Sequence, residues 1–478
     1  MSPSDLSDPD ARAAWRHHLG GLLRGRRVIC AIAPLAAYVD WVALLETAAA
    51  HRPLLVASGV GAGPVPRPEQ ADVVLLDVPE STSPTEELRR LDGILRALPD
   101  ALVRAVEAYD PDGTAVWLAN PFVTTAPVLG REVIGGRPER WFALEDKLVV
   151  DDLWDSVGVP RAASRAVPVD LARLRAVSAD LDAGAGVVWA GDAREGFNGG
   201  GDFVRWVVTD ADAAAACDFF SRRCDRVRVM PFLEGVPCSI HGLVLPDGTA
   251  AFRPVELAIL RGGADGAGAG RRFVYGGLGS TWDPPEQDRA QMRDVARRTG
   301  ERLRELVGYR GAFGIDGILT ADGFRPTELN SRMSAGATAL ARTVDPCLVD
   351  LLQHNLLAGR DPAVDVAGLE AWAVPAMDGA RFAKAVGIST RRVVGERWDV
   401  PVVWNGRTLQ RGDGPTGWSV SAGPNPAGTY CRLNTPREPP PELRVAELNV
   451  ALMRFLDEEL DTGFGEVAAP PDVRTVLR

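Results

Sequence analysis

The sequence predicts a protein of mixed class, in which a parallel α/β layer precedes α+β units and a small β-rich C-terminal segment. Three observations carry this prediction. Strand-like runs alternate with helical patterns up to about residue 140. Two antiparallel strands, a helix and another strand follow up to about residue 235, and "GAFGIDGILTADGFRPTELNSR" has the pattern of a β-hairpin. With 478 residues, two to four domains are expected, each able to bury its own core.

The first segment reads as alternating strands and helices. Strands are expected in "RRVICAIAP", "PLLVAS", "ADVVLLDV" and "TAVWLANPFV", with helices near 36–50 and 84–108. The stretch "SGVGAGPVPRP" lacks the GxGxxG spacing of a dinucleotide loop, and Pro64 and Pro66 stand where its helix should begin. A plain turn is favoured there.

The second segment has the order of an α+β unit. "RWFALEDKLVVDDLWDSVG" predicts a helix ending at Gly158, followed by a strand-like stretch and a helix near 170–181. "AGVVWAGD" and "DFVRWVVTD" predict two strands joined by the loop "AREGFNGGG". A helix near 211–222 then leads to the strand "DRVRVMPFLEG".

The rest of the chain predicts hairpins, one long helix and a final helix. A hairpin is expected around Pro246-Asp247-Gly248, then a glycine-rich loop over 262–280, a helix near 285–307 and the hairpin that turns at Ala321-Asp322-Gly323. Beyond 360, short strands and turns precede a helix near 441–460. The predicted domains are 1–140, 141–235, 236–360 and a C-terminal cap over 361–478.

Composition excludes several classes. The 53 basic and 64 acidic residues give a net charge of -11, which argues against a nucleic-acid-binding protein. The six scattered cysteines form no CxxC pair and no zinc spacing, and read as reduced thiols. No apolar run has the length of a membrane span, so a soluble, cytoplasmic protein without membrane partners is expected.

Lysine is almost absent from this arginine-rich chain. Lys147 and Lys384 are its only lysines. Where coding bias favours arginine, a retained lysine indicates a position that needs a compact ammonium group. A surface lysine without a role is the alternative.

The hairpin over 311–332 groups side chains suited to a magnesium ion. Asp316 lies on its first arm, and Glu328 and Asn330 are two residues apart on the second, so they share a face. Mg²⁺ takes one or two carboxylates together with nucleotide phosphates. Arg332 continues that face and can contact phosphate with two parallel hydrogen bonds. On this pattern alone, polar residues on the solvated side of a hairpin stay an alternative.

These elements, taken in order, resemble the ATP-grasp superfamily of carboxylate–amine ligases over about residues 141–345. The resemblance rests on "EDK" opening a helix, "GVP" after it, a glycine-rich loop between two strands, "VMPFLEG" at the adenine hinge, and "GIDGILTADGFRPTELNSR", which is similar to the terminal D…ExN(x)R element. The first segment is similar to the pre-ATP-grasp domain. A narrower resemblance is to actinobacterial natural-product peptide ligases of the pheganomycin type.

The resemblance implies a role for each matching residue. Lys147 contacts ATP phosphates, and Asp316, Glu328 and Asn330 hold magnesium, with two ions expected and Mn²⁺ as an alternative metal. Arg332 stabilises the acyl phosphate. The phosphate lid comprises Asn198, Gly199, Gly200 and Gly201, and the adenine pocket comprises Met230, Pro231, Phe232 and Leu233, for which an ordinary buried strand is the alternative.

The sequence departs from the family pattern at three positions. Trp189 stands where a second phosphate-binding lysine is usual, so Arg194 or Arg205 substitutes or nucleotide binding is weakened. Met230 replaces the usual hinge glutamate, and Pro237 replaces a ribose-binding acid. These changes affect adenosine contacts more than the metal site.

The implied function is an ATP-dependent ligase that joins an acid to an amine or peptide through an acyl phosphate, with a homodimer as the common assembly. His241 is a candidate base, with a structural role as the favoured alternative. Arg261, Arg271 and Arg272 are substrate-carboxylate candidates or solvated loop residues. Other functions stay open: a nucleotide-binding protein without activity, an ATP-grasp kinase, or a carboxylase, although no "MKM" biotin site is present.

Overall fold

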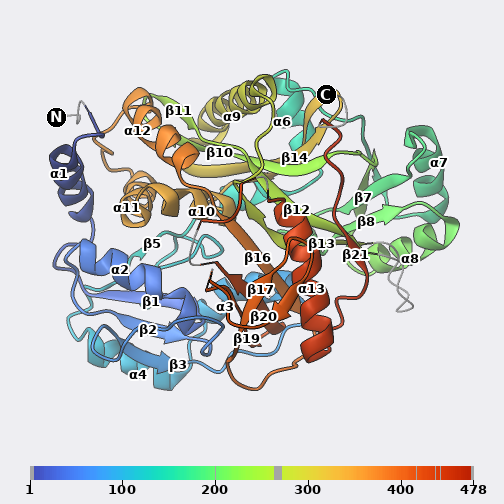
Figure 1. The fold of residues 1–478 in the computed structure, drawn as a ribbon. Coiled ribbons are helices and arrows are strands. Elements are labelled where there is room, and N and C mark those ends of the chain that lie inside the picture. The colour runs from blue at the N-terminus through green and yellow to red at the C-terminus, as the bar shows by residue number, and fades with distance from the viewer. Residues whose placement is uncertain are drawn as a thin grey trace.

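The computed structural model describes residues 5–199, 201–262, 272–415, 417–435, 438–441 and 443–474. Its N-terminal part is a five-stranded, all-parallel sheet in the order β3-β2-β1-β4-β5 (Figure 1). The strands are β1 (Val28–Ala33), β2 (Leu54–Ala57), β3 (Asp72–Leu75), β4 (Val116–Leu118) and β5 (Val133–Ile134). The predicted parallel α/β layer is therefore confirmed.

Helices cover both faces of this sheet because successive strand residues point to opposite sides. On one face, Ile29 packs with α3 (Pro84–Arg96) and α4 (Asp100–Tyr109). On the other face, Val28 and Cys30 pack with α1 (Pro9–Gly20), with α2 (Val39–Thr47) and with a later helix, α11 (Pro346–Leu357). A short 3-10 turn, η1 (Leu35–Ala37), precedes α2. The core shared with α11 joins this layer to the rest of the molecule.

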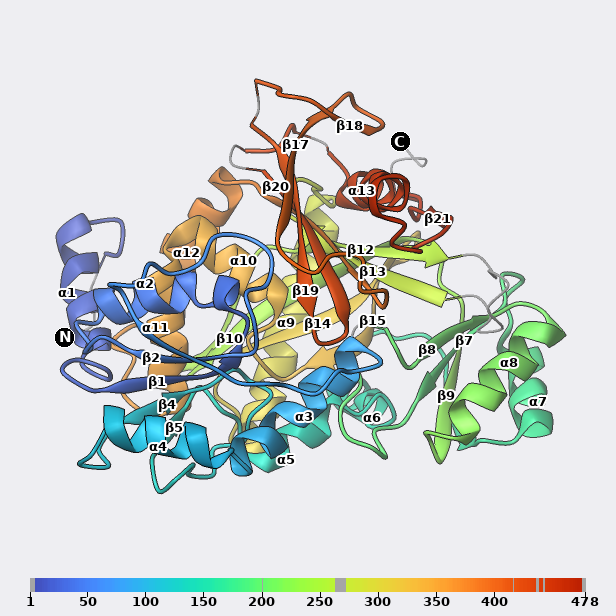
Figure 2. The same cartoon turned by 90° about the horizontal axis from the view of Figure 1, so that it is seen from below.

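A four-stranded antiparallel sheet in the order β6-β9-β7-β8 forms one edge of the molecule (Figure 2). Its strands are β6 (Arg165–Pro168), β7 (Val187–Gly191), β8 (Val204–Val207) and β9 (Arg226–Pro231). Two helices, α7 (Leu171–Leu181) and α8 (Asp210–Ser221), pack on one face around Leu174, Phe220 and Val229.

The largest sheet has twelve strands and runs through the centre of the molecule in the order β15-β14-β10-β12-β13-β16-β20-β19-β17-β18, with β11 and β21 paired to its side. Its first part comprises β10 (Val236–Leu245), β11 (Gly248–Ala251), β12 (Val255–Gly262), β13 (Arg272–Gly279), β14 (Gly311–Thr320) and β15 (Gly323–Asn330). The long helix α9 (Glu286–Val307) packs on β10 and β14 through Met292, Val295 and Leu303.

The C-terminal segment continues that same sheet. It contributes β16 (Ala383–Ser389), β17 (Trp398–Trp404), β18 (Leu409–Arg411), β19 (Ser419–Asn425), β20 (Gly428–Asn434) and β21 (Val467–Ala468). Helix α13 (Val445–Leu460) covers one face of β12, β13 and β16, where Ala258, Ala383 and Leu452 share a core. Strands predicted beyond 360 and the final helix are thus confirmed.

Four local predictions need correction. The helix expected over 84–108 is two helices, because Pro99 carries extended backbone between α3 and α4. The helix expected after residue 140 is interrupted: α5 (Glu139–Phe142) and η2 (Ala143–Glu145) precede α6 (Val150–Ser156), and Asp146 between them accepts the Leu148 N–H at 2.9 Å instead of continuing the helix.

The third correction concerns residues interpreted as loop, and the fourth difference is a set of helices for which no prediction was made. Arg272–Gly279 is strand β13, paired to β12 and β16, while 263–271 lies outside the described residues. Helices α10 (Ala335–Val344), α11 and α12 (Val366–Gly379) were not predicted. Their small residues and the internal Pro375 weaken the helical pattern, and packing against β11, β14 and each other supplies the stability.

Within the described residues, no helix is long and apolar enough to cross a membrane.

Candidate functional site

The hairpin of β14 and β15 brings the predicted metal ligands together. Its two-residue turn at Ala321 and Asp322 sets a register in which Asp316 lies opposite Glu328, as predicted. Asn330 donates from Nδ2 to Asp316 Oδ2 at 2.9 Å, so its amide oxygen stays available as an acceptor. Thr327 is the extra residue of a bulge, since Gly317 pairs with Pro326.

The surroundings of Asp316 disfavour its negative charge. Burial, and then the neighbouring charge of Glu328, raise the pKa of Asp316 to about 6. No group of three or more His, Cys, Asp or Glu side chains with metal-site geometry occurs among the described residues. Two carboxylates with one amide oxygen fit Mg²⁺, which fills its remaining positions with phosphate and water.

Lys147 already stands as a cation against this pair. Its Nζ lies 2.9 Å from Glu328 Oε2 and donates to the Asn198 carbonyl at 3.3 Å. The side chain is buried, with 5% exposed. The turn at Asp146 that interrupts the predicted helix is what carries Lys147 toward the hairpin.

Arg332 is held by a buried carboxylate. Glu145 accepts from Arg332 Nη1 and from Arg137 Nη1, the latter at 2.5 Å. Burial acts to raise the pKa of Glu145, but the charges of Arg332 and Arg137 outweigh it and hold that pKa below its usual value. The Arg332 guanidinium also lies 5.0 Å from the ring centre of Phe122. Glu145 was not singled out from the sequence.

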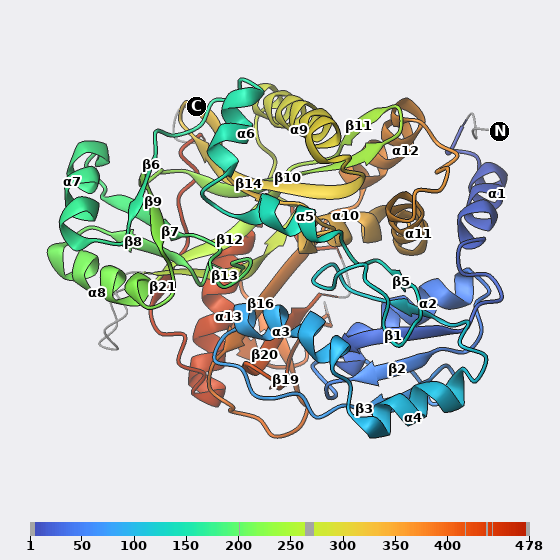
Figure 3. The ribbon, with the colours of Figure 1, turned by 180° about the vertical axis from the view of Figure 1, so that it is seen from behind.

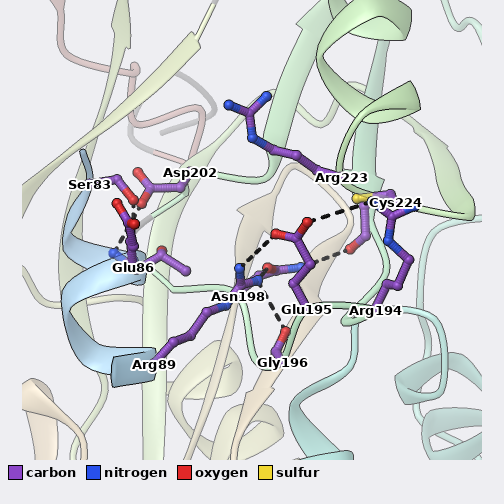
Figure 4. A network of polar contacts seen from close by, with 12 residues as sticks. Ser83, Glu86, Arg89, Arg194, Glu195, Gly196, Asn198, Asp202, Arg223 and Cys224 are labelled. Atoms are coloured by element: carbon purple, nitrogen blue, oxygen red, sulfur yellow. Dashed lines mark hydrogen bonds and ion pairs between the residues drawn. The ribbon is translucent and has the colours of Figure 1, made fainter. Parts of the chain in front are cut away.

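The glycine-rich loop after β7 is attached to helix α3 of the N-terminal layer (Figure 4). Arg89 donates to the carbonyls of Phe197 at 2.8 Å and Gly196 at 3.2 Å, and to the Asn198 side chain. Thr85 exchanges hydrogen bonds with Gly199 through its hydroxyl, at 2.9 and 3.3 Å. This contact could not be predicted from the sequence, because the partners are more than 100 residues apart.

Three of the four predicted lid residues are described: Asn198 is buried, Gly199 and Gly201 line the cavity, and Gly200 lies outside the described residues. Asn198 donates from Nδ2 to the Asp192 carbonyl at 2.7 Å. The loop is therefore bound between α3, the end of β7 and Lys147.

A cavity of about 530 Å³ extends from the hairpin to the four-stranded sheet. Met230, Phe232 and Leu233 line it, together with Pro237, whereas Pro231 does not and instead pairs with Val187. Phe232 stacks on Trp206 with ring centres 4.5 Å apart. Its N–H donates to the Gly186 carbonyl at 3.0 Å, so this main-chain group does not point to the cavity.

The wall formed by β7 carries no charge. Val188 and Ala190 line the cavity, while Trp189 points to the opposite face and donates from Nε1 to Ser178 Oγ at 2.9 Å. The residue facing the cavity where a lysine was expected is thus apolar, and Trp189 belongs to the core beneath α7.

Neither predicted substitute for that lysine reaches the cavity lining. Arg194 pairs with Asp225 at 3.1 Å, and Arg205 lies over the Phe219 ring at 3.9 Å.

The described cation that lines this wall is Arg228 on β9, opposite Ala190. It is buried and binds Asp151 through Nε at 2.9 Å and Nη2 at 2.6 Å. Arg228 could have been found from the sequence, because residues two apart on a strand share a face and Met230 was already predicted to line the adenine pocket.

His241 and Arg261 also line the cavity. Burial lowers the pKa of His241 to about 3, and its Nε2 lies 3.2 Å from Ser239 Oγ. A Cβ at Gly336 would lie 2.3 Å from His241 Cε1, so the ring packs tightly against α10.

Arg261 lies 5.0 Å from the Phe232 ring centre and pairs with Glu234. Arg272 donates to the Phe464 carbonyl at 3.3 Å, and Arg271 lies outside the described residues.

No protein-family model and no curated protein matches this sequence. Solved structures share its fold over nearly the whole chain. A phosphoribosylamine–glycine ligase from Thermotoga maritima matches with a TM-score of 0.51 at 13% identity, covering 93% of this chain and 97% of the ligase. The biotin carboxylase domain of a Hydrogenobacter thermophilus 2-oxoglutarate carboxylase, solved with MgADP and bicarbonate, matches with a TM-score of 0.50 at 12% identity, covering 93% and 91%. The chain therefore has the fold of these two enzymes, and the predicted combination of α/β and α+β parts is confirmed.

Proposed function

We propose that this protein is an ATP-dependent ligase that forms an amide between a carboxylic acid and an amine, releasing ADP and phosphate. The observation that carries the proposal is the grouping of Asp316 and Glu328 with two cations, Lys147 and Arg332, on the wall of one cavity. The ligase and the biotin carboxylase domain that share the fold act on small molecules, in line with this class of reaction.

The chemistry needs charge neutralisation more than a nucleophile. An oxygen of the acid attacks the γ-phosphorus of ATP, and the bond to the bridging oxygen of ADP breaks, giving an acyl phosphate. The amine then attacks the carbonyl carbon, and phosphate leaves with the oxygen that came from the acid. Lys147 and Arg332 offset the negative charge that develops on the transferred group.

Asp316, Glu328 and Asn330 would hold Mg²⁺, which neutralises phosphate charge when bound. We infer one or two ions, with Mn²⁺ as a substitute. The loop that contains Asn198 and Gly199 would cover the phosphates and keep water from the acyl phosphate. Met230, Phe232 and Leu233 would enclose the adenine, with Arg228 adding positive charge beside the apolar β7 wall.

The substrates are expected to be small acids with amines or peptides, in a natural-product pathway in the cytoplasm, and the assembly a homodimer. The alternative is a nucleotide-binding protein without activity. The uncharged β7 wall, where Val188 and Ala190 face the cavity, favours that alternative.

A hydroxylamine screen separates the two functions. Purified protein, Mg-ATP and pooled carboxylic acids are incubated with hydroxylamine as the amine, and hydroxamates and nucleotides are measured by chromatography. The ligase yields hydroxamate and ADP with particular acids only. Nucleotide binding without any nucleotide consumption over a broad acid pool would instead support the inactive binding protein.

A further inference from the structure

A second group of cations lies on the large sheet, outside the cavity lining. Lys384 on β16 and Arg432 on β20 come from neighbouring strands, in which Val386 pairs with Arg432. Their strand neighbours Ala383, Ala385 and Cys431 are buried in the core under α13. Because strand residues alternate between faces, Lys384 and Arg432 both point to the face away from α13.

That face is the one that forms the cavity floor. Lys384 lies opposite Leu278 in the ladder, and Leu278 lines the cavity with Leu257 and Tyr275. The face therefore continues without interruption from the cavity across β13 and β16 to β20. Viewed from below, β20 and its neighbour β19 run toward helix α3 of the N-terminal layer (Figure 2).

The N-terminal layer closes this region with loops at the carboxyl ends of its parallel strands. A Cβ at Gly63, in the loop after β2, would lie 3.1 Å from Arg432 Nη1. Arg397 donates to the Gly63 carbonyl at 3.0 Å. Open parallel sheets bind ligands at the carboxyl ends of their strands, so the cations face a location suited to a ligand.

The charges that act on Lys384 are those of Arg342, Arg432 and Asp40. Arg432 also acts on Asp399, a carboxylate that pairs with Arg397. Arg342 on α10 is also close to Lys384, but it is already paired with Asp40 on α2. Within the part of the chain that the structure describes, the side chains of Lys384 and Arg432 make no hydrogen bond and no ion pair, and both residues are half-buried. Burial, together with the charges of Arg342 and Arg432, lowers the pKa of Lys384 to about 8.

We propose that Lys384 and Arg432 form a binding site for an anionic group, a carboxylate or a phosphate, carried by a substrate. The attribution to a substrate rests on the proposed ligase function, whereas anion binding itself does not. An ammonium beside a planar guanidinium suits an anion with several oxygens. The site would hold the substrate by a group that does not react, away from the carboxylates of the hairpin.

The chain offers a direct test because it has only two lysines. The rate at which a small amine-reactive ester acylates Lys384 and Lys147 is followed by peptide mass spectrometry, with inorganic phosphate, succinate or chloride at equal ionic strength. Pairing with an anion stabilises the protonated amine, so phosphate or succinate should slow acylation of Lys384 about fivefold at pH 8. Chloride should not.

Variants tie the effect to this site. Arg432→Met and Arg432→Gln should abolish the protection of Lys384, whereas Arg411→Met, which removes an arginine paired with Glu459 in the same sheet, should keep it. Protection by phosphate alone or by succinate alone supports the site and selects the anion class.

Absence of protection by both anions, equal protection by chloride, or unchanged protection in both Arg432 variants would overturn the proposal. The readout uses no ATP and no turnover, so a failed hydroxamate screen and a failed anion site give different results.

Discussion

At the residue scale, the hairpin brings two carboxylates and the ammonium group of Lys147 close together. Glu328 both faces Asp316 and binds Lys147 at 2.9 Å. The ion pair with Lys147 stabilises the folded protein, while repulsion between the two carboxylates destabilises it. These two effects act in opposite directions when Glu328 is changed.

Glu328→Gln should therefore separate activity from stability. We expect turnover to fall by about 10²–10³-fold, because the variant loses a carboxylate that would hold the Mg²⁺ ion, which neutralises phosphate charge. The melting temperature should change by only a few degrees, because relief of repulsion offsets the lost pair with Lys147. Hydroxamate formation and thermal melts measure the two effects. Turnover at the wild-type level would refute the assigned metal role.

Lys147→Met tests the second charge. Removing the buried ammonium should raise the apparent KM for ATP by about tenfold, the effect of one lost contact between a charged group and phosphate. Steady-state kinetics with varied ATP measure it, and Arg411→Met serves as the control. A KM for ATP equal to that of wild type would show that Lys147 does not contact the ATP phosphates.

At the scale of elements, the glycine-rich loop and helix α3 act together. Arg89 contacts two loop carbonyls and the Asn198 side chain, so it fixes a segment that glycine leaves conformationally free. The neighbouring Arg90 binds the Glu80 carbonyl and Glu86 without touching the loop. One helix thus supplies both a test position and its control.

Arg89→Met should release the loop. Amide hydrogen exchange over 195–199 should accelerate about tenfold or more, because the lost hydrogen bonds are each worth about 1 kcal/mol. ATP hydrolysis without amide formation should also increase, since water reaches the acyl phosphate. Arg90→Met should leave both unchanged. Unaltered exchange in Arg89→Met would show that the loop is held by other contacts.

The sequence predicted elements best where hydrophobic periodicity was strong. The parallel strands, the β14–β15 hairpin and α9 follow from it directly. Breaks set by single residues were missed, such as Pro99 between α3 and α4 and the turn at Asp146. Local patterns do not encode side-chain hydrogen bonds that compete with a helix.

The candidate site was predictable only in part for a related reason. Asp316 and Glu328 are close in sequence, so the hairpin pattern alone placed them opposite each other. Glu145 and Arg89 reach the site through tertiary contacts, which one sequence does not reveal. Trp189 was expected on the phosphate side of its strand, but it points to the opposite face. In a mostly apolar run such as "GVVWAG", the sequence does not show which residues face which side of the sheet.

At the scale of the whole molecule, the N-terminal layer lies against the C-terminal part of the large sheet, where Arg397 donates to the Gly63 carbonyl and Arg392 pairs with Glu80. Seen from behind, α3 and the parallel sheet lie beside the strands of the C-terminal segment (Figure 3). Lys384 lies where these parts meet, with its pKa lowered to about 8 from an ordinary value of 10.5.

The stability of the molecule should therefore depend on pH through Lys384. Between about pH 8 and 10.5 the unfolded chain keeps this proton while the folded chain has lost it, so the contribution of Lys384 to the free energy of unfolding rises with pH. Urea denaturation of wild type and Lys384→Met at pH 7 to 10 measures the difference. Wild type should gain relative to the variant as pH rises, and a constant difference would contradict the buried, unpaired ammonium.

The proposed function requires transfer of the γ-phosphoryl group of ATP to the carboxylate of the acid. The most direct measurement uses the acid selected by the hydroxamate screen, labelled with ¹⁸O in its carboxylate, and follows the label by ³¹P NMR. Acyl-phosphate formation should give ADP and inorganic phosphate that carries ¹⁸O from the acid. Label in AMP, or unlabelled phosphate formed together with the amide, would contradict it.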